Sequence, residues 1–314
     1  MKPLFIVLII TSVIIVVFLL FLFYVYSRIF WMNKKEKKRA QIFDVPFGKE
    51  HKDVVLGNTK KLESISHQDV YVKSFDGKIL HGFYYHINDN SPLEIGFHGY
   101  KGQAFRDFSG GALFALEKGF NLLLVEERAH GMSGGSTITF GIKERKDVLT
   151  WINYANIELN KNHNPILLTG ISMGAATVLM ASNLALPNNV KGIIADCPYT
   201  SPIEIIGEVL KKMKLSPKIL YPFVCLSAFL FGHFRIKEES AENAVKSALV
   251  PILLIHGEND NFVPFEMGKK IAEASKKIEF HAFPNADHGC SYLEDPKRYI
   301  EIVNEFIDRV IYGG

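Results

Sequence analysis

The sequence predicts an α/β fold: a doubly wound, mostly parallel sheet with helices on both faces, behind one N-terminal membrane-spanning helix. From about residue 40, short apolar runs alternate with helical stretches, which is typical of such a sheet. Runs such as 166–168 and 252–255 are apolar without a break, as expected for parallel strands that are buried on both faces. Ahead of them, residues 4–26 form a run of 23 residues without a charge.

Composition excludes several classes of protein. The chain has 314 residues, of which 48% are hydrophobic, and a net charge of +3, so it is not intrinsically disordered. Three cysteines without a C-x-x-C motif exclude a disulfide scaffold and a zinc ribbon. Residues 1–39 hold seven basic residues and one acidic residue, whereas the remainder has a net charge of −3. That remainder lacks the basic face of a nucleic-acid binder, so we expect no nucleic-acid partner.

The uncharged run is long enough to be a membrane anchor. As a helix, its 23 residues extend about 34 Å, which crosses the hydrocarbon core of a bilayer. A cleaved signal peptide is the alternative, but its apolar region is shorter, and residues 27–31 offer no cleavage site with small residues. Aromatic residues gather at the exit, as they do at a membrane interface: Tyr24, Tyr26, Phe30 and Trp31. We therefore predict an uncleaved, single-pass anchor that contacts membrane lipid.

The flanks of this run predict its orientation. Only Lys2 precedes it, whereas the following residues are strongly basic: Arg28, Lys34, Lys35, Lys37, Lys38 and Arg39, against Glu36 alone. The positive-inside rule places that second flank, and with it the folded body, on the cytoplasmic side of the cell membrane. Unpaired cysteines agree with a reducing compartment. The basic run either lies against anionic headgroups or acts as a stop-transfer flank without lipid specificity, and both interpretations remain open.

We divide the chain into an anchor with its basic segment, residues 1–39, and a folded domain, residues 40–314. The predicted strands are 70–73, 79–85, 93–97, 121–125, 165–169, 190–195, 251–256 and 278–283, and Asp76-Gly77 indicates a hairpin between the first two. The predicted helices are 110–117, 143–156, 172–184, 264–276 and 296–310.

One stretch interrupts the alternation of strands and helices. Residues 198–246 lie between two predicted strands, begin with Pro198, contain three further prolines and are too long for a crossover loop. We expect a helical insertion over the C-terminal edge of the sheet, which would act as a lid. Its apolar patch at 221–231 is either core beneath the lid or a channel for an acyl chain.

The strongest motif is Gly170-Ile171-Ser172-Met173-Gly174, which follows an apolar strand and opens a helix with two small residues. In such a turn, glycines on either side of a serine let strand and helix approach closely, and the serine hydroxyl stands above the sheet. The next amide, that of Met173, lies at a helix N-terminus and can stabilise an oxyanion.

Two partners for this serine follow later in the chain. Asp260 comes just after the strand at 251–256, and His288 comes just after the last predicted strand. A serine is a poor nucleophile unless an imidazole takes its proton and a carboxylate orients that imidazole. All three residues follow strands, so we expect them at the carboxyl edge of the sheet, where α/β proteins place their sites.

At this point the chain resembles the α/β-hydrolase superfamily, from about Val70 to the C-terminus. The resemblance rests on His98-Gly99-Tyr100, Arg128-Ala129-His130-Gly131-Met132-Ser133, the Ser172 turn, the H-G-x-x-D pattern at 256–260 with Val263-Pro264, and His288. Within the superfamily it is most similar to bacterial, often membrane-anchored hydrolases of the serine aminopeptidase and prolyl-oligopeptidase-like group, also through residues 196–202. It departs at Glu126-Glu127-Arg128-Ala129-His130-Gly131, where relatives often have Asp-x-Arg-Gly-His-Gly, which weakens assignment to any particular family.

The resemblance implies roles for individual residues. Ser172 is the nucleophile, Asp260 orients, and His288 is general base and then general acid. The Tyr100 amide joins that of Met173 in the oxyanion hole. No metal or organic cofactor is implied, and the substrate is a small-molecule acyl compound or a peptide.

Other residues have alternative interpretations. Asp196 also follows a strand and is a second candidate for the triad acid, although Asp260 occupies the usual position. We expect His98 to order a loop rather than act as a base. Cys290 is expected to be an inert packed thiol rather than a reactive one. Glu144, Arg145 and Asp147 resemble an ion-paired helix face.

We therefore predict a serine hydrolase that cleaves an ester or thioester with an apolar acyl group through an acyl-Ser172 intermediate. A serine peptidase acting on short peptides is the alternative within enzymes. A non-catalytic receptor or scaffold with a hydrolase fold is the alternative outside them, and it would require a broken triad.

Overall fold

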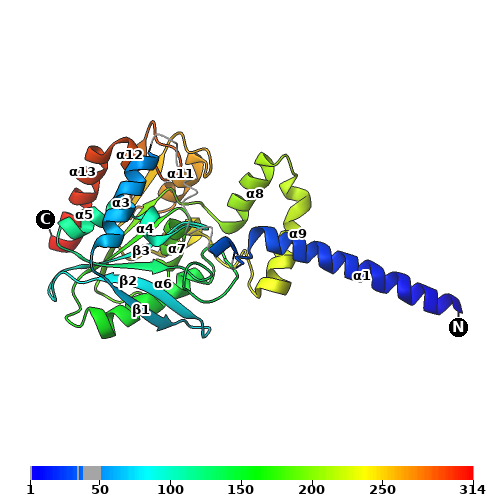
Figure 1. Ribbon diagram of the computed structural model, residues 1–314. Helices are drawn as coiled ribbons and strands as arrows, with labels where there is room; N and C mark the ends of the chain where they lie inside the picture. Colours follow the sequence, from blue (N-terminus) through cyan, green and yellow to red (C-terminus); the bar gives the residue numbers. More distant parts are fainter. Residues whose placement is uncertain (1, 34, 38–50, 314) are drawn as a thin grey trace.

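A computed structural model describes residues 2–33, 35–37 and 51–313 of the chain (Figure 1). An eight-stranded sheet lies at its centre, in the order β1-β2-β4-β3-β5-β6-β7-β8. The strands are β1 (Gln68–Lys73), β2 (Ile79–Tyr85), β3 (Leu93–Phe97), β4 (Asn121–Glu126), β5 (Ile166–Ile171), β6 (Val190–Asp196), β7 (Ile252–Gly257) and β8 (Ile278–Phe283). Strand β2 is antiparallel to β1 and β4, and all other pairs are parallel, so the predicted α/β fold with a mostly parallel sheet is confirmed.

The predicted hairpin at Asp76-Gly77 is also confirmed. Strands β1 and β2 pair in register from Gln68 opposite Tyr84 to Lys73 opposite Ile79. Gly77 has a φ of 84°, a conformation that favours glycine in such turns.

Helices cover both faces of the sheet. Helices α6 (Glu144–Tyr154), α7 (Met173–Ala181), α10 (Ala241–Ala244) and α11 (Phe265–Glu273) pack on one face. Helices α3 (Lys52–Ser64), α4 (Ala104–Asp107), α5 (Gly111–Glu117), α12 (Ser291–Glu294) and α13 (Pro296–Ile307) lie on the other. Strands β3, β4 and β7 are buried at every position, which explains their nearly uninterrupted apolar sequences.

Helix α3 has no counterpart among the predicted elements. It buries only Val55, Thr59 and Leu62, and its exposed residues are mostly polar apart from Val54. Three buried positions in 13 residues, one of them a threonine, are too weak a periodic signal to distinguish an amphipathic helix from a loop.

Helix α1 (Lys2–Ile29) projects away from the body (Figure 1). Its segment Pro3–Ile29 is long and apolar enough to cross a membrane, with a mean hydropathy of 3.4. Residues 3–21 are exposed, but Leu22, Tyr26, Phe30 and Met32 are buried against the folded body. The end of α1 and the residues after it are therefore part of the core. Lys34, Lys38 and Arg39, and the predicted boundary between residues 39 and 40, lie outside the described residues.

The predicted insertion at 198–246 contains α8 (Pro202–Lys212), α9 (Pro217–Gly232) and α10. Figure 1 shows α8 and α9 beside the body, where α9 crosses the end of α1. The patch 221–231 has two sides: Val224 and Ala228 are buried, whereas Phe229 and Leu230 are exposed. Part of its packing is against α1, because the Phe223 ring lies 5.3 Å from that of Phe21.

Candidate active site

Ser172 stands at a sharp turn between β5 and α7. Its φ of 55° and ψ of −112° are unfavourable for a residue with a side chain, at a cost of about 1–3 kcal/mol. Two glycines make the turn possible. A Cβ on Gly174 would lie 1.8 Å from the carbonyl oxygen of Phe97, and one on Gly170 would lie 2.4 Å from the carbonyl carbon of Gly174. The structure thus has the strand-to-helix turn that the G-x-S-x-G motif predicts.

The structure brings Ser172, Asp260 and His288 together at the carboxyl edge of the sheet. The Ser172 hydroxyl lies 2.9 Å from Nε2 of His288, and Nδ1 of His288 lies 2.7 Å from Oδ2 of Asp260. In the neutral ring, Nδ1–H donates to the carboxylate and Nε2 accepts from the hydroxyl. The serine side chain can therefore pass its proton directly to the imidazole.

The Asp260 carboxylate is held from several sides. Its Oδ1 accepts hydrogen bonds from the amides of Phe262 (2.8 Å) and Val263 (2.7 Å). Its Oδ2 also lies 3.3 Å from Nε2 of His256. Burial alone would raise the pKa of Asp260, but hydrogen bonds from His256 and His288 outweigh it and hold the pKa well below its ordinary value. At neutral pH a fixed negative charge faces Nδ1 of His288.

Two backbone amides near Ser172 are free to bind an oxyanion. Within the described part of the chain, neither the amide of Tyr100 nor that of Met173, the first residue of α7, donates a hydrogen bond. The amides on either side of Tyr100 are occupied: that of Gly99 donates to Asp107 (2.9 Å) and that of Lys101 to His130 (3.0 Å). A Cβ on Gly99 would lie 3.5 Å from that of Ser172, so this turn passes directly beside the serine.

His98 and His130 hold this turn in place. Nε2 of His98 accepts from the amide of Glu127 (3.0 Å), and its Nδ1 donates to the carbonyl of Gly99 (2.8 Å). His130 bonds in the same way, between Lys101 and the carbonyl of Arg128. Burial lowers the pKa of both rings, which are neutral and fully engaged. This agrees with the expectation that His98 orders a loop.

Asp196 supports the turn by its backbone. Its carbonyl accepts the amide of Ser172 at 2.8 Å. Its carboxyl is buried, burial raises its pKa to about 6, and Oδ1 has no partner among the described residues. Nδ1 of His288 bonds to Asp260, so the geometry favours Asp260 over Asp196 as the orienting acid.

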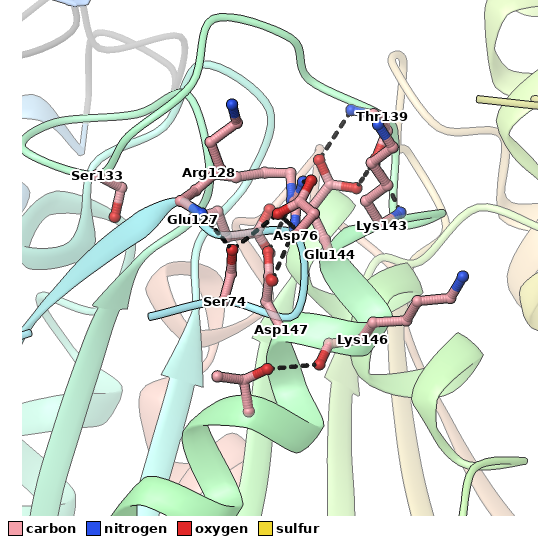
Figure 2. Close-up of polar contacts among 12 residues, drawn as sticks. Ser74, Asp76, Glu127, Arg128, Ser133, Thr139, Lys143, Glu144, Lys146 and Asp147 are labelled. Carbon is pink, nitrogen blue, oxygen red and sulfur yellow. Dashed lines mark hydrogen bonds and ion pairs between the residues drawn. The ribbon is translucent and has the colours of Figure 1, made fainter. Parts of the chain in front are cut away.

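A buried charge network lies beside the loop at 126–133 (Figure 2). Arg128 donates to Asp147 at 2.7 Å and to Asp76 at 3.0 Å. Glu144 accepts the amides of Thr139 and Gly141 at 2.8 and 2.9 Å. The ion pairs expected of the helix face at 144–147 are present, since Asp147 pairs with Arg128 and Arg145 with Glu238. The implied position at the surface is wrong, because Glu144, Arg145 and Asp147 are all buried. Glu144 and Asp147 tie the start of α6 to the preceding loops, whereas Arg145 ties it to Glu238.

Glu127 is a further buried acid beside this network. Its side chain is buried, and neither oxygen has a partner among the described residues. Burial raises its pKa well above the ordinary value, and the nearby charges of Glu144 and Asp147 raise it further. Both effects disfavour the charged carboxylate of Glu127.

Sequence reasoning missed residues of the N-terminal segment that contact the site. The hydroxyl of Tyr100 donates to the carbonyl of Ile29 at 2.9 Å, and Lys101 forms an ion pair with Glu36 at 2.9 Å. Lys37, predicted to face lipid or to act as a stop-transfer flank, donates to the carbonyl of Ser133 at 2.7 Å. No local pattern signals contacts across such distances in sequence.

Cysteines near the site are protonated. The Cys197 sulfur lies with a carboxylate oxygen of Asp260 and a ring nitrogen of His288 in a group whose atoms are within 4.8 Å of one another. Burial raises the pKa of Cys197 well above its ordinary value, which disfavours a thiolate metal ligand. Cys290 is also buried, and burial raises its pKa to about 12, in agreement with an inert thiol.

The dienelactone hydrolase family model matches residues 141–305, more than half of the chain. The chain belongs to the dienelactone hydrolase family. The match includes Ser172, Asp260 and His288, and family membership confirms the predicted α/β-hydrolase superfamily and a hydrolytic enzyme.

Several solved structures and sequence relatives are similar to this chain. The solved esterase Pf2001 of Pyrococcus furiosus has 25% sequence identity and a TM-score of 0.66, over 80% of this chain and 94% of that one. Acylaminoacyl peptidase of Pyrococcus horikoshii shares the fold, with 20% identity and a TM-score of 0.58 over 81% of this chain and 43% of that one. The uncharacterized protein YqkD of Bacillus subtilis is 27% identical over 198 residues, which are 62% of this chain. The match spans 64% of YqkD, less than two thirds of its length.

Proposed function

We propose that this chain is a membrane-anchored carboxylic ester hydrolase that cleaves an ester or thioester with an apolar acyl group. The observation that carries the proposal is the hydrogen-bonded line from Ser172 through His288 to Asp260, with distances of 2.9 and 2.7 Å. The dienelactone hydrolase family match and the likeness to the Pyrococcus furiosus esterase support the class of reaction.

Acylation begins at the serine. Oγ of Ser172 attacks the carbonyl carbon of the ester while Nε2 of His288 takes the hydroxyl proton. The negative charge that develops on the carbonyl oxygen is stabilised by the amides of Tyr100 and Met173. When the tetrahedral intermediate collapses, the carbon–oxygen or carbon–sulfur bond breaks, and His288 gives its proton to the departing alcohol or thiol.

Deacylation repeats these steps with water. Nε2 of His288 takes a proton from a water molecule that attacks the acyl-Ser172 carbonyl, and then returns a proton to Oγ as the carboxylic acid leaves. The ionised Asp260 stabilises the imidazolium form of His288 in both halves of the reaction, because its low pKa keeps it charged at neutral pH.

The preference for an apolar acyl group follows from the proposed location. Helix α1 anchors the chain, and the basic residues after it favour a body on the cytoplasmic face. The domain from residue 40 onward, with the helices at 198–246 as its lid, would then act close to the membrane. Substrates that dissolve in lipid are concentrated there.

The test uses the purified full chain in detergent and a fluorophosphonate probe, which reacts with activated serines. We expect labelling of the wild type, none for Ser172→Ala, and slow labelling for Asp260→Asn, since loss of the orienting carboxylate costs roughly 10⁴-fold in kcat in such triads. A series of esters with increasing acyl length should then show a preference for longer chains.

Other outcomes would change the conclusion. Release of amino-acid amides with negligible ester hydrolysis would identify a serine peptidase instead. A folded wild type that does not react would favour a receptor or scaffold with a hydrolase fold, and equal rates on short and long esters would contradict the apolar acyl group.

A further inference from the structure

Helix α9 has an apolar stripe that no described residue covers. Exposed residues recur every three or four positions, and so lie on one helix face: Ile219, Pro222, Leu226, Phe229 and Leu230. Ile219 is 66% exposed and Phe229 is 54% exposed. The opposite face is packed, since Val224 and Ala228 are buried. Such a large apolar face in contact with water is unfavourable, which indicates an interaction surface.

The stripe lies next to the membrane-spanning candidate α1. The ring of Phe223 lies 6.2 Å from that of Phe18 and 5.3 Å from that of Phe21. Further along α9, Phe231 lies 5.4 Å from Phe23 and 5.8 Å from Tyr26. Helix α9 therefore crosses α1 just where α1 leaves the body (Figure 1).

The length of α1 sets the depth of this crossing. Residues 3–21 are exposed, and at 1.5 Å per residue they extend about 28 Å, close to the roughly 30 Å of a hydrocarbon core. From Leu22 onward, α1 begins to bury side chains in the body. The edge of the hydrocarbon core thus falls near residue 21, the level at which Phe223 packs.

The charge around the stripe matches an anionic surface. Residues 209–237 contain no acidic residue and six basic ones: Lys211, Lys212, Lys214, Lys218, Arg235 and Lys237. Lys211 is paired with Glu208 at 2.7 Å, which leaves five positive charges in the segment without an ion-pair partner among the described residues. The chain after residue 39 is otherwise acidic overall, so this segment is a local concentration of positive charge. An apolar helix face with lysines around it is the pattern of helices that lie in a membrane interface.

We propose that α9 is embedded in the surface of a bilayer containing anionic phospholipid, with its stripe among the acyl chains and the basic residues on either side of it, together with its own Lys218, among the headgroups. The proposal rests on the membrane anchoring of α1 proposed above. It adds a second lipid contact, made by the lid itself, which fixes α8 and α9 at the membrane.

This contact also reaches the site. The ammonium of Lys212, the last residue of α8, lies 5.7 Å from the centre of the Phe262 ring. That ring lies 5.1 Å from the ring of His288. A lid held in the bilayer therefore places the wall of the active site beside the lipid, so an ester dissolved in the membrane has a short route to Ser172.

The depth of α9 is measured on the full chain in nanodiscs of phosphatidylcholine and phosphatidylglycerol. A fluorescent label is attached to Ile219→Cys or Phe229→Cys in a Cys225→Ala background, because Cys197 and Cys290 are buried. Ile157→Cys is the matched control, since Ile157 is also 66% exposed and lies on the body. Val13→Cys reports on α1.

We expect nitroxide lipids to quench the fluorescence of the labels at 219 and 229. Iodide in the water should quench these two labels at least about fivefold less than it quenches the label at 157, because interfacial helices lie some 5–10 Å deep. If the labels at 219 and 229 respond to iodide like the label at 157, the proposal is overturned. The label at 13 distinguishes the proposed anchoring by α1 from the proposed embedding of α9. If this label alone is in lipid, α1 is a membrane anchor and α9 is not embedded. If the label at 13 is in water, the proposed membrane anchor is wrong, and the labels at 219 and 229 still show whether α9 itself contacts lipid.

A functional measurement uses Ile219→Asp and the matched Ile157→Asp. An aspartate in the stripe should lower hydrolysis of a long-chain ester dissolved in the nanodisc by about tenfold, and leave a water-soluble short-chain ester unaffected. Ile157→Asp should change neither rate. Equal rates of Ile219→Asp and wild type on the membrane ester would contradict a lid that must sit in the bilayer.

Discussion

The phenol of Tyr100 donates a hydrogen bond to the main-chain carbonyl of Ile29 at 2.9 Å. Ile29 is the last residue of α1, and Tyr100 carries one of the two amides of the proposed oxyanion hole. The ion pair between Glu36 and Lys101 joins the same two segments. The end of α1 and the residues after it therefore pack directly on the turn that carries the Tyr100 amide.

Tyr100→Phe tests this connection. The variant keeps the ring, which stacks on Phe140 at 5.0 Å, and loses only the hydrogen bond to Ile29. A neutral hydrogen bond contributes about 0.5–1.5 kcal/mol. Loss of this bond should leave the turn that carries the Tyr100 amide less well positioned, and should lower kcat about fivefold with little change in KM. Steady-state kinetics with a water-soluble ester measures this. Tyr71→Phe, at an exposed position on β1, is the control, and an unchanged kcat for Tyr100→Phe would show that His130 and Asp107 hold the turn alone.

Two truncations distinguish the exposed part of α1 from the part that packs in the core. Deletion of residues 2–20 removes exposed apolar surface, and the remaining domain should stay folded. Deletion of residues 2–32 also removes Leu22, Tyr26, Phe30 and Met32, which are buried. Each buried side chain of this kind contributes about 1.5–3 kcal/mol. The longer deletion should therefore lower Tm by at least about 10 °C or cause aggregation, as measured by differential scanning fluorimetry, and equal Tm values would be inconsistent with this packing.

Backbone strain at Ser172 should be visible in the thermal stability of variants at this position. Glycine tolerates a φ of 55° and alanine does not, so Ser172→Gly should unfold at a Tm a few degrees above that of Ser172→Ala, for a strain of about 1–3 kcal/mol. Both variants should be inactive. Ser182, at the end of α7, has an ordinary φ of −61°, and there the order of alanine and glycine should reverse. If alanine is preferred at both positions, Ser172 is not strained.

Glu94 should make stability depend on pH. It lies on β3, and burial raises its pKa to about 7. The unfolded chain releases this proton near pH 4.3, whereas the folded chain keeps it until about pH 7. Between these values the unfolded state binds fewer protons, so the free energy of unfolding falls as the pH rises, and it levels off above the folded pKa.

The variant Glu94→Gln stays neutral and should lack this fall. Relative to wild type it should gain up to about 3 kcal/mol between pH 5 and pH 8, as measured by urea denaturation at the two values. Glu158→Gln, at an exposed position, should follow the wild-type profile. Parallel profiles for wild type and Glu94→Gln would show that the Glu94 carboxyl titrates normally.

Much of the fold and the core of the candidate site was predictable because their signals are local. Strand β5, the Ser172 turn and helix α7 are adjacent in sequence, and the two glycines that the turn requires stand within it. Asp260 and His288 were predictable because each follows a strand of a parallel sheet, whose carboxyl ends meet at one edge.

Other features depend on contacts between distant segments. From their charge alone, Glu144 and Asp147 were interpreted as residues of a helix face at the surface. The structure shows that they are buried with Arg128 in an internal network. The sequence favoured Asp260 over Asp196 by its position alone, and the His288 ring adds the contact itself, because its Nδ1 bonds to Asp260. Likewise, the sequence left open what the patch at 221–231 contacts. Apolar residues are equally suited to contact the core, another helix or lipid, so the composition of the patch does not distinguish these neighbours.

By itself, the sequence determined the sheet, the order of serine, aspartate and histidine, and an apolar N-terminal helix, since periodicity, turn residues and a long uncharged run act within short stretches of chain. Only the tertiary structure decided that the end of this helix packs into the body, holds Tyr100 and meets α9. Such contacts arise from shape and burial between segments far apart in the chain, and no short stretch of sequence encodes them.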